Sequence, residues 1–266
     1  MKIVLTGGHS GIGLALSNTL LSEGHELALI VRNEERAEQV KESLINATNV
    51  TFFYADLAKQ SDVLNVAKKI TEQWPQIDGL FNNAGILLDK NYYSEQQNEM
   101  HLEVNTLAPY VLTQALVKNL QSSHEAFVIN TSTGGLHNQK SIKLEQLIQP
   151  KTFVKLMGAY YQSKLATVVV MSELSEHHPQ LRILNVDPGA LKTKMTGDKD
   201  AMPWIMRIIR ALFFQAPDKG AQKLYNGAFS AEFKTLTNAY ITGNKVQPLK
   251  LKINKDDVQA LLAGVN

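Results

Sequence analysis

The sequence contains no cysteine among its 266 residues. This absence excludes disulfide bonds, thiolate zinc sites and a cysteine nucleophile, and it fits a reducing compartment. Long apolar runs are also missing, because the stretches 27–31 and 165–171 fall far short of the roughly 18 residues that a membrane-spanning helix needs. The first residues carry no basic and apolar signal pattern. We therefore expect a cytoplasmic protein without a membrane span.

Charge of one sign is scarce as well. Lysine and arginine number 27 and aspartate and glutamate number 25, which gives a net charge of +2 without any concentrated run. Such a balance offers no electrostatic footprint for nucleic acid. No metal site is expected, since the pair His177–His178 has no carboxylate cluster beside it. A hydrophobic share of 44% indicates a globular chain with a sizeable core.

Short aliphatic runs alternate with longer stretches of helical period along the chain. The expected strands span residues 2–6, 26–31, 50–54, 79–82, 126–131, 181–186 and 239–242. The expected helices span residues 11–23, 34–46, 61–74, 97–121, 158–178 and 218–229. This alternation is typical of βαβ units on a parallel sheet. We expect residues 1–266 to form one α/β domain, a doubly wound, mainly parallel seven-stranded sheet with helices on both faces.

A glycine-rich loop follows the first strand and opens directly into a helix. A helix N-terminus presents free N–H groups and a partial positive charge, and glycine lets a pyrophosphate approach the backbone. A glycine-rich turn without a ligand is the alternative. The position of the loop, in the first strand–turn–helix unit, favours a dinucleotide site of the Rossmann type. The residues expected to bind the cofactor here are Thr6, Gly7, His9, Ser10, Gly11, Ile12 and Gly13.

The end of the second strand predicts which dinucleotide is bound. An acidic residue there holds the ribose 2′-hydroxyl of NAD, whereas an arginine accommodates the 2′-phosphate of NADP. Here the strand ends at Arg32, His9 is available nearby, and no carboxylate follows until Glu34. The sequence therefore favours NADP(H) over NAD(H), with a simple exposed arginine as the alternative.

Tyr160 and Lys164 lie four residues apart in an expected helix and so share one face. An ammonium group near a phenol favours the phenolate and lowers its pKa, which makes tyrosine usable in proton transfer near neutral pH. Tyr161 has Leu165 in the equivalent place and is the weaker candidate. The spacing alone also arises by chance on surface helices.

Taken with the glycine loop, several further motifs resemble the short-chain dehydrogenase/reductase family. They are Asn82-Asn83-Ala84-Gly85, Asn105, Ser132-Thr133, Tyr160 with Lys164, and Pro188-Gly189 with Thr193. Most of them follow the carboxyl end of an expected strand, where open α/β sheets bind ligands. The motif Ala159-Tyr160-Tyr161-Gln162-Ser163-Lys164 further resembles the retinol-dehydrogenase-like branch.

The resemblance implies roles for these positions. Asp56, with Leu57 beside it, would contact adenine, although Asp56 could also be a helix N-cap. The residues Asn83, Ala84 and Gly85 would line the cofactor cleft, and Pro188, Gly189 and Thr193 would bind the nicotinamide end. Asn105 would kink its helix and hold a water that links Lys164 to solvent, and Lys164 would also bind the nicotinamide ribose.

One position departs from the family pattern. The family commonly has two serines after the fifth strand, and we align Thr133 with the second, which orients the substrate carbonyl. A threonine hydroxyl can make the same hydrogen bond. Ser132 stays an alternative for this role.

The assembled prediction is hydride transfer between nicotinamide and a carbonyl or alcohol. Tyr160 would donate the proton, Thr133 or Ser132 would bind the oxygen, and Lys164 with Asn105 would restore the proton. One alternative is a non-catalytic NADP(H) sensor, and another is an epimerase or dehydratase that keeps NAD bound. The presence of every catalytic residue type disfavours the first, and Arg32 disfavours the second.

The retinol-dehydrogenase-like branch acts on bulky lipophilic alcohols, aldehydes and ketones. Residues 194–216 are suited to such lipophilic substrates, because they contain the apolar segment 204–214, which is broken by Arg207 and Arg210. We expect this substrate loop to be a lid over an apolar pocket. A peripheral membrane contact is the second interpretation and a homo-oligomer interface the third; a homo-oligomer is expected.

Overall fold

In a computed structural model of the protein, the described residues are 1–154, 158–189 and 216–265. Within these ranges one sheet holds eight strands in the order β3-β2-β1-β4-β5-β6-β7-β8. Their bounds are β1 Lys2–Thr6, β2 Glu26–Val31, β3 Val50–Tyr54, β4 Gly79–Asn82, β5 Phe127–Thr131, β6 Arg182–Val186, β7 Ala239–Thr242 and β8 Lys245–Val246. All neighbours from β3 to β7 are parallel, and β7 and β8 are antiparallel. The expected fold class is confirmed, but the expected number of seven strands is wrong, because the two-residue β8 is too short to leave a pattern.

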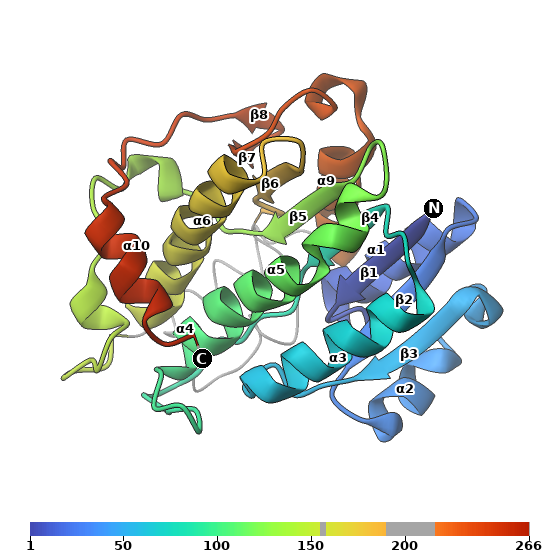
Figure 1. Cartoon of the computed structure of the whole chain (residues 1–266), viewed down its shortest axis with the longest axis horizontal. Helices are drawn as coiled ribbons and strands as arrows, with labels where there is room; N and C mark the ends of the chain where they lie inside the picture. The colour runs from blue at the N-terminus through green and yellow to red at the C-terminus, as the bar shows by residue number, and fades with distance from the viewer. Residues whose placement is uncertain (155–157, 190–215, 266) are drawn as a thin grey trace.

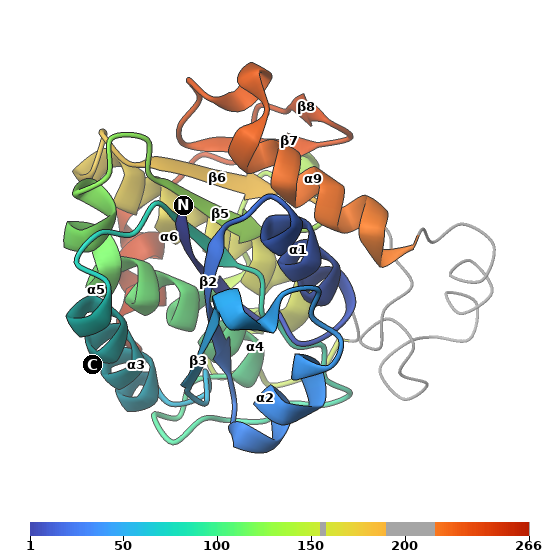
Figure 2. The same ribbon diagram turned by 90° about the vertical axis from the view of Figure 1, so that its right-hand side faces the viewer.

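Helices cover both faces of the sheet (Figures 1 and 2), with α3, α5 and α6 on one face and α1, α2 and α9 on the other. Their bounds are α1 Gly11–Ser22, α2 Glu34–Lys41, α3 Gln60–Gln73, α4 Met100–Leu102, α5 Ala108–Gln121, α6 Ala159–His177, α9 Pro217–Phe229 and α10 Lys255–Leu262. The expected helix 97–121 is instead α4, a π-helical turn at Glu103–Leu107, and α5. Helix α2 ends at Lys41, five residues before the expected end at residue 46, and α10 was not predicted.

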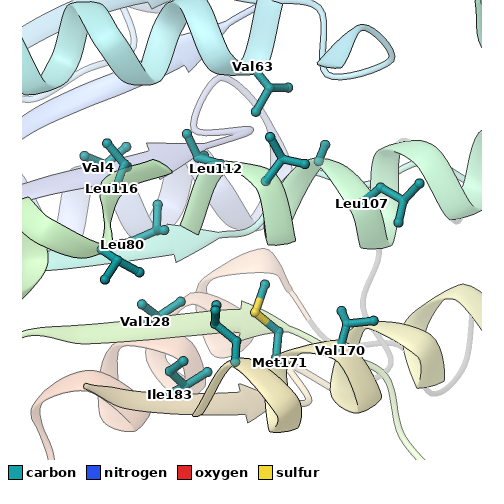
Figure 3. Packing of buried hydrophobic residues seen from close by; sticks show 14 of the residues in the cluster. Val4, Val63, Leu80, Leu107, Leu112, Leu116, Val128, Val170, Met171 and Ile183 are labelled. Carbon is teal, nitrogen blue, oxygen red and sulfur yellow. The ribbon is translucent and has the colours of Figure 1, made fainter. Parts of the chain in front are cut away.

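The side chains of each strand divide between two hydrophobic cores. On β1, Val4 packs into the core that contains α3, α5 and α6, whereas Ile3 and Leu5 pack into the core that contains α1 and α9. Figure 3 shows the first core, in which Val4, Leu80 and Val128 of the sheet face Leu112 and other helix residues. A sheet buried on both faces explains why its strands are continuous apolar runs rather than alternating ones.

The carboxyl ends of the central strands are held in register by a row of buried asparagines. Asn82 donates to Oδ1 of Asn130 at 2.9 Å, and Asn130 donates to Oδ1 of Asn185 at 3.2 Å. These residues are the register partners of β4, β5 and β6. The loops that leave these three strands therefore begin side by side at one edge of the sheet.

No helix in the described ranges combines the length and the apolar character needed to cross a bilayer. The same ranges contain no group of three or more histidine or acidic side chains arranged to hold a metal ion.

Candidate active site

The glycine loop after β1 is held in a shape that only small residues permit. Gly7 and Gly11 have φ angles of +68° and +54°, in the left-handed region that favours glycine. A Cβ on Gly13 would lie 2.0 Å from the carbonyl oxygen of Gly7, so no larger residue fits there. The side chain of Ser10, the N-cap of α1, does not cap the helix. The loop thus forms a close turn over the N-terminus of α1, as a phosphate site requires.

A hydrogen-bond network ties this loop to the end of β4. The hydroxyl of Thr6 accepts from the backbone N–H groups of Asn83 and Ala84, both at 3.0 Å. The amide of Asn83 donates in turn to the carbonyl oxygens of Thr6 at 3.2 Å and Gly7 at 3.3 Å. The structure therefore brings together the expected cofactor residues of two separate loops.

A cavity of about 330 Å³ lies beyond the end of β2. It is lined by Arg32, Asp56, Ala58, Ile86, Leu88, Asp89, Tyr92, Met100 and Val104. Arg32 and Asp56 form an ion pair with Nε and Oδ1 3.8 Å apart, and the Arg32 side chain is 69% exposed. A largely exposed guanidinium at the rim of a cavity can meet an incoming phosphate. The two residues expected at the adenosine end are thus neighbours.

Asn105 lies in the π-helical turn Glu103–Leu107 and is buried. Its Oδ1 accepts from the N–H of Ile86 at 2.8 Å, and its Nδ2 donates to the carbonyl of Ile86 at 3.1 Å and to Oγ of Ser163 at 3.0 Å. A Cβ on Gly85 would lie 3.1 Å from Oδ1 of Asn105 and 3.3 Å from Nζ of Lys164. Three expected site residues from three segments of the chain therefore meet around one point. A π-helical turn is itself frequent at functional sites.

Tyr160 and Lys164 both lie in the first two turns of α6. The Nζ of Lys164, a residue that is 5% exposed, donates to the carbonyl of Thr131 at 2.9 Å. Burial lowers the pKa of Lys164 to about 8. Burial and, to a lesser extent, the charge of Asp187 raise the pKa of Tyr160 to about 12. This direction is opposite to the lowering expected from the lysine, because burial disfavours the phenolate and the ammonium is directed at a carbonyl.

The two candidate hydroxyls after β5 have different surroundings. Ser132 is 6% exposed, and its buried Oγ has no hydrogen-bond partner among the described residues. Thr133 is half-buried, and its carbonyl accepts from the hydroxyl of Tyr240 at 2.7 Å. A buried hydroxyl without a protein partner is costly, so the Ser132 hydroxyl is available to bind a water or a ligand oxygen.

The loop after β6 begins with Asp187, which the sequence reasoning missed. Its Oδ1 accepts from the N–H of Gly189 at 2.8 Å and its Oδ2 from Thr242 at 2.6 Å. Gly189 has a φ of +86°, which suits the tight turn after Pro188. The available signal was a carboxylate directly before Pro-Gly at a strand end. Thr193 and the expected lid at 194–216 lie outside the described residues, apart from residue 216.

Glu99 and His101 were also missed. Their buried side chains are hydrogen-bonded, with Oε1 of Glu99 2.8 Å from Nδ1 of His101, and the His101 ring contacts Tyr160 edge-on. Both residues fall in a stretch that the helical pattern assigned to one ordinary helix, so the sequence carried no signal for this pair.

A model of the short chain dehydrogenase family matches residues 1–143 of the chain. The human dehydrogenase/reductase SDR family member 12 is 29% identical over 202 residues, which cover 75% of this chain and 63% of that protein. The chain thus spans less than two thirds of the length of this relative, and it spans 60% of the cattle protein of the same name.

Two other curated relatives align over more of their length. Human polyprenol dehydrogenase is 27% identical and mouse retinol dehydrogenase 11 is 25% identical, and these alignments cover 91% and 90% of this chain and 76% of each relative. The chain therefore resembles the branch that includes the retinol dehydrogenases.

Solved structures agree on the fold. Levodione reductase has a TM-score of 0.70 at 20% identity, with 90% of this chain and 94% of that chain covered. The alcohol dehydrogenase of the archaeon Thermococcus sibiricus, complexed with 5-hydroxy-NADP, has a TM-score of 0.68 at 21% identity, with 92% and 96% covered.

The buried ammonium of Lys164 predicts a specific dependence of stability on pH. Because the pKa falls from 10.5 to about 8 on folding, the unfolded state binds more protons between these values, and the free energy of unfolding rises with pH there. Below pH 8 the buried charge costs stability. We expect Lys164→Met to raise the free energy of unfolding at pH 7 by about 1–3 kcal/mol, an advantage that shrinks as pH rises towards 10.5.

Urea unfolding of the cofactor-free protein between pH 7 and pH 10 measures this effect. Lys118→Met, which removes an exposed lysine of α5, is the matched control and should show no such pH dependence. A Lys164→Met protein that is less stable at pH 7, with a deficit that does not change with pH, would contradict the account.

Proposed function

The chain belongs to the short-chain dehydrogenase family, and we propose that it is an NADP(H)-dependent oxidoreductase that acts on a carbonyl or alcohol of a lipophilic small molecule. The observation that carries the proposal is that Gly85, Asn105 and Lys164 meet around one point. Tyr160 lies one turn before Lys164 on α6. Each of these residues was expected from the sequence to serve one reaction. Their meeting at the edge where the parallel strands end supports a single site.

The residues present fit a dinucleotide. The close packing of Gly13 against the carbonyl of Gly7 gives a tight turn over the N-terminus of α1, and this turn is the cradle for a pyrophosphate. Thr6, Asn83 and Ala84 brace this cradle, and Arg32 at the rim of the 330 Å³ cavity would bind a 2′-phosphate. When bound, the cofactor supplies the hydride. The protein supplies the orientation and the proton.

The proton would come from Tyr160. With a pKa of about 12 its phenol is protonated at neutral pH and can donate to an oxygen that gains negative charge. Lys164, with a pKa of about 8, is able to gain and lose a proton near neutral pH. Asn105 lies against the same point as the Lys164 ammonium and would hold the route by which the proton is restored.

Ser132 is the better candidate for binding the substrate oxygen. Its Oγ is buried without a partner, whereas Thr133 is more exposed and its carbonyl is engaged by Tyr240. A substrate carbonyl would give the Ser132 hydroxyl an acceptor at the moment when negative charge develops. We therefore assign to Ser132 the role that the alignment of motifs gave first to Thr133.

The support for a lipophilic substrate comes from the proteins to which this chain is similar. Relatives of this chain include proteins named retinol dehydrogenase and polyprenol dehydrogenase. A homo-oligomer and a cytoplasmic location stay predictions from the sequence.

Oxidation of NADPH and of NADH, followed at the nicotinamide absorbance with nonanal, benzaldehyde, citral and cyclohexanone, tests the proposal. We expect turnover with NADPH that falls by about a hundredfold to ten-thousandfold in Tyr160→Phe, because the proton donor is lost. Tyr161→Phe, the neighbouring tyrosine of α6, is the control and should stay active. Cofactor binding without turnover on any compound would favour a sensor and contradict the proposal.

Single substitutions distinguish the two hydroxyls. Ser132→Ala should lower kcat by about a hundredfold, the usual cost of removing one donor to a developing oxyanion. Thr133→Val removes the hydroxyl but keeps the volume of the side chain and leaves the backbone carbonyl of residue 133 in place. It should lower kcat by less than about tenfold. A larger loss in Thr133→Val than in Ser132→Ala would reverse the assignment.

Arg32→Asp tests the choice of cofactor. Replacing a cation that binds the 2′-phosphate should lower the ratio of kcat/KM for NADPH over NADH by about tenfold to one hundredfold. Arg36→Asp makes the same charge change on the exposed side of α2 and should leave the ratio nearly unchanged. An unchanged ratio in Arg32→Asp removes Arg32 from this role.

A further inference from the structure

The pair formed by Glu99 and His101 is buried directly against the proposed proton donor. Their side chains are 0% and 1% exposed, and Oε1 of Glu99 lies 2.8 Å from Nδ1 of His101. The rings of His101 and Tyr160 lie edge-to-face, with centroids 6.3 Å apart and an interplanar angle of 76°. None of the roles assigned above uses this pair.

The hydrogen bonds of the pair fix its protonation. The N–H of Leu88 donates to Nε2 of His101 at 3.0 Å, so Nε2 carries a lone pair and Nδ1 carries the proton. The proton on Nδ1 is donated to Glu99, whose second oxygen accepts the N–H groups of His101 at 2.8 Å and Leu102 at 3.2 Å. Glu99 therefore accepts three hydrogen bonds, as a buried carboxylate must. His101 has no lone pair left for a substrate and cannot be its base.

The pair instead holds the segment that follows Gly85. Leu88 is held by His101, and Ile86, two residues earlier, is held at both its N–H and its carbonyl by Asn105. Ile86 and Leu88 both line the cavity. One ring thus contacts the cavity wall at Leu88 and the ring of Tyr160 at the same time.

Glu99 is also the N-cap of α4, because its side chain accepts from the N–H groups of His101 and Leu102. Capping does not require the histidine ring, and burying a carboxylate costs desolvation that an uncharged capping residue avoids. Glu103, one turn further on, is a second buried acid, but its partners are Gln60, Ser94 and Asn98, away from Leu88 and Tyr160. It provides a matched comparison.

We propose that Glu99 and His101 are positioning residues for the reaction, which fix the backbone of Leu88 and the ring of Tyr160 relative to Asn105. This inference rests on the proposed function. Glu99 sets the tautomer of His101, and the tautomer lets Nε2 accept from Leu88. If the backbone of Leu88 or the ring of Tyr160 is misplaced by about 1 Å, the rate falls roughly a hundredfold.

Four variants separate the elements of this chain of contacts. His101→Phe keeps a ring edge against Tyr160 but removes both hydrogen bonds. His101→Gln places an amide near the position of Nε2, where its oxygen can accept from Leu88. Glu99→Gln presents an N–H to Nδ1 and so favours the tautomer that carries a proton on Nε2, facing the N–H of Leu88. Glu103→Gln is the control.

Two measurements on the full chain with NADP(H) are made for each variant: hydrogen exchange of the Leu88 amide by NMR, and kcat and KM for the reduction of nonanal or citral. We expect His101→Phe and Glu99→Gln to speed exchange of the Leu88 amide and to lower kcat at saturating NADPH by about tenfold to one hundredfold. The KM for NADPH should rise as well, because Leu88 lines the cavity at the adenosine end. His101→Gln should keep most of the protection of the Leu88 amide and most of the kcat. Glu103→Gln should keep both at the level of the unaltered chain. In the unaltered protein, NMR of the imidazole nitrogens should find Nε2 without a proton.

The result that overturns the inference is an active unaltered chain in which His101→Phe keeps its kcat, or in which Glu103→Gln loses as much as Glu99→Gln. A proton on Nε2 of His101 in the unaltered chain also overturns it, whether or not any variant folds. An unaltered chain that reduces no aldehyde contradicts the proposed function instead, and the catalytic part of this inference then falls with it.

Discussion

In the part of the chain that the structure describes, seven parallel strands end at the same edge of the sheet, and the site depends on this constraint. Because β1, β4, β5 and β6 end side by side, loops that are far apart in sequence begin within hydrogen-bonding distance of one another. The row formed by Asn82, Asn130 and Asn185 fixes the register of three of these ends. The bonds from Thr6 to the backbone after β4 then join the glycine loop to the same edge.

The same edge collects buried polar groups that a simple core would not contain. Lys164 keeps an ammonium in the interior with a lowered pKa, Tyr160 has a raised pKa, and Ser132 has a hydroxyl without a partner. The buried ammonium and the hydroxyl without a partner cost stability, and such groups gather where a protein performs chemistry. The buried Glu99–His101 pair adds a fourth group of this kind, and it contacts the ring of Tyr160.

Much of this arrangement could be predicted from the sequence, since apolar runs and glycine spacing mark strands and turns locally. The seven longer strands and most of the helices follow from such patterns. The shift in the pKa of Tyr160 was predicted in the wrong direction. The four-residue spacing indicates that Lys164 is a neighbour, but it does not indicate that Tyr160 is buried or that the Lys164 ammonium donates to the carbonyl of Thr131. The contacts of Asp187 and of His101 join segments far apart in the chain, so no local pattern contains them. The π-helical turn at Asn105 was expected only as a kink.

The proposed function depends on direct transfer of a hydride from the cofactor, with protein groups supplying only orientation and a proton. Reduction of nonanal with NADPH that carries deuterium at both C4 positions of the nicotinamide, followed by mass spectrometry of the alcohol, tests this most directly. Direct transfer places one deuterium on the carbon that bears the hydroxyl. An alcohol whose new hydrogen on that carbon comes from water would contradict it.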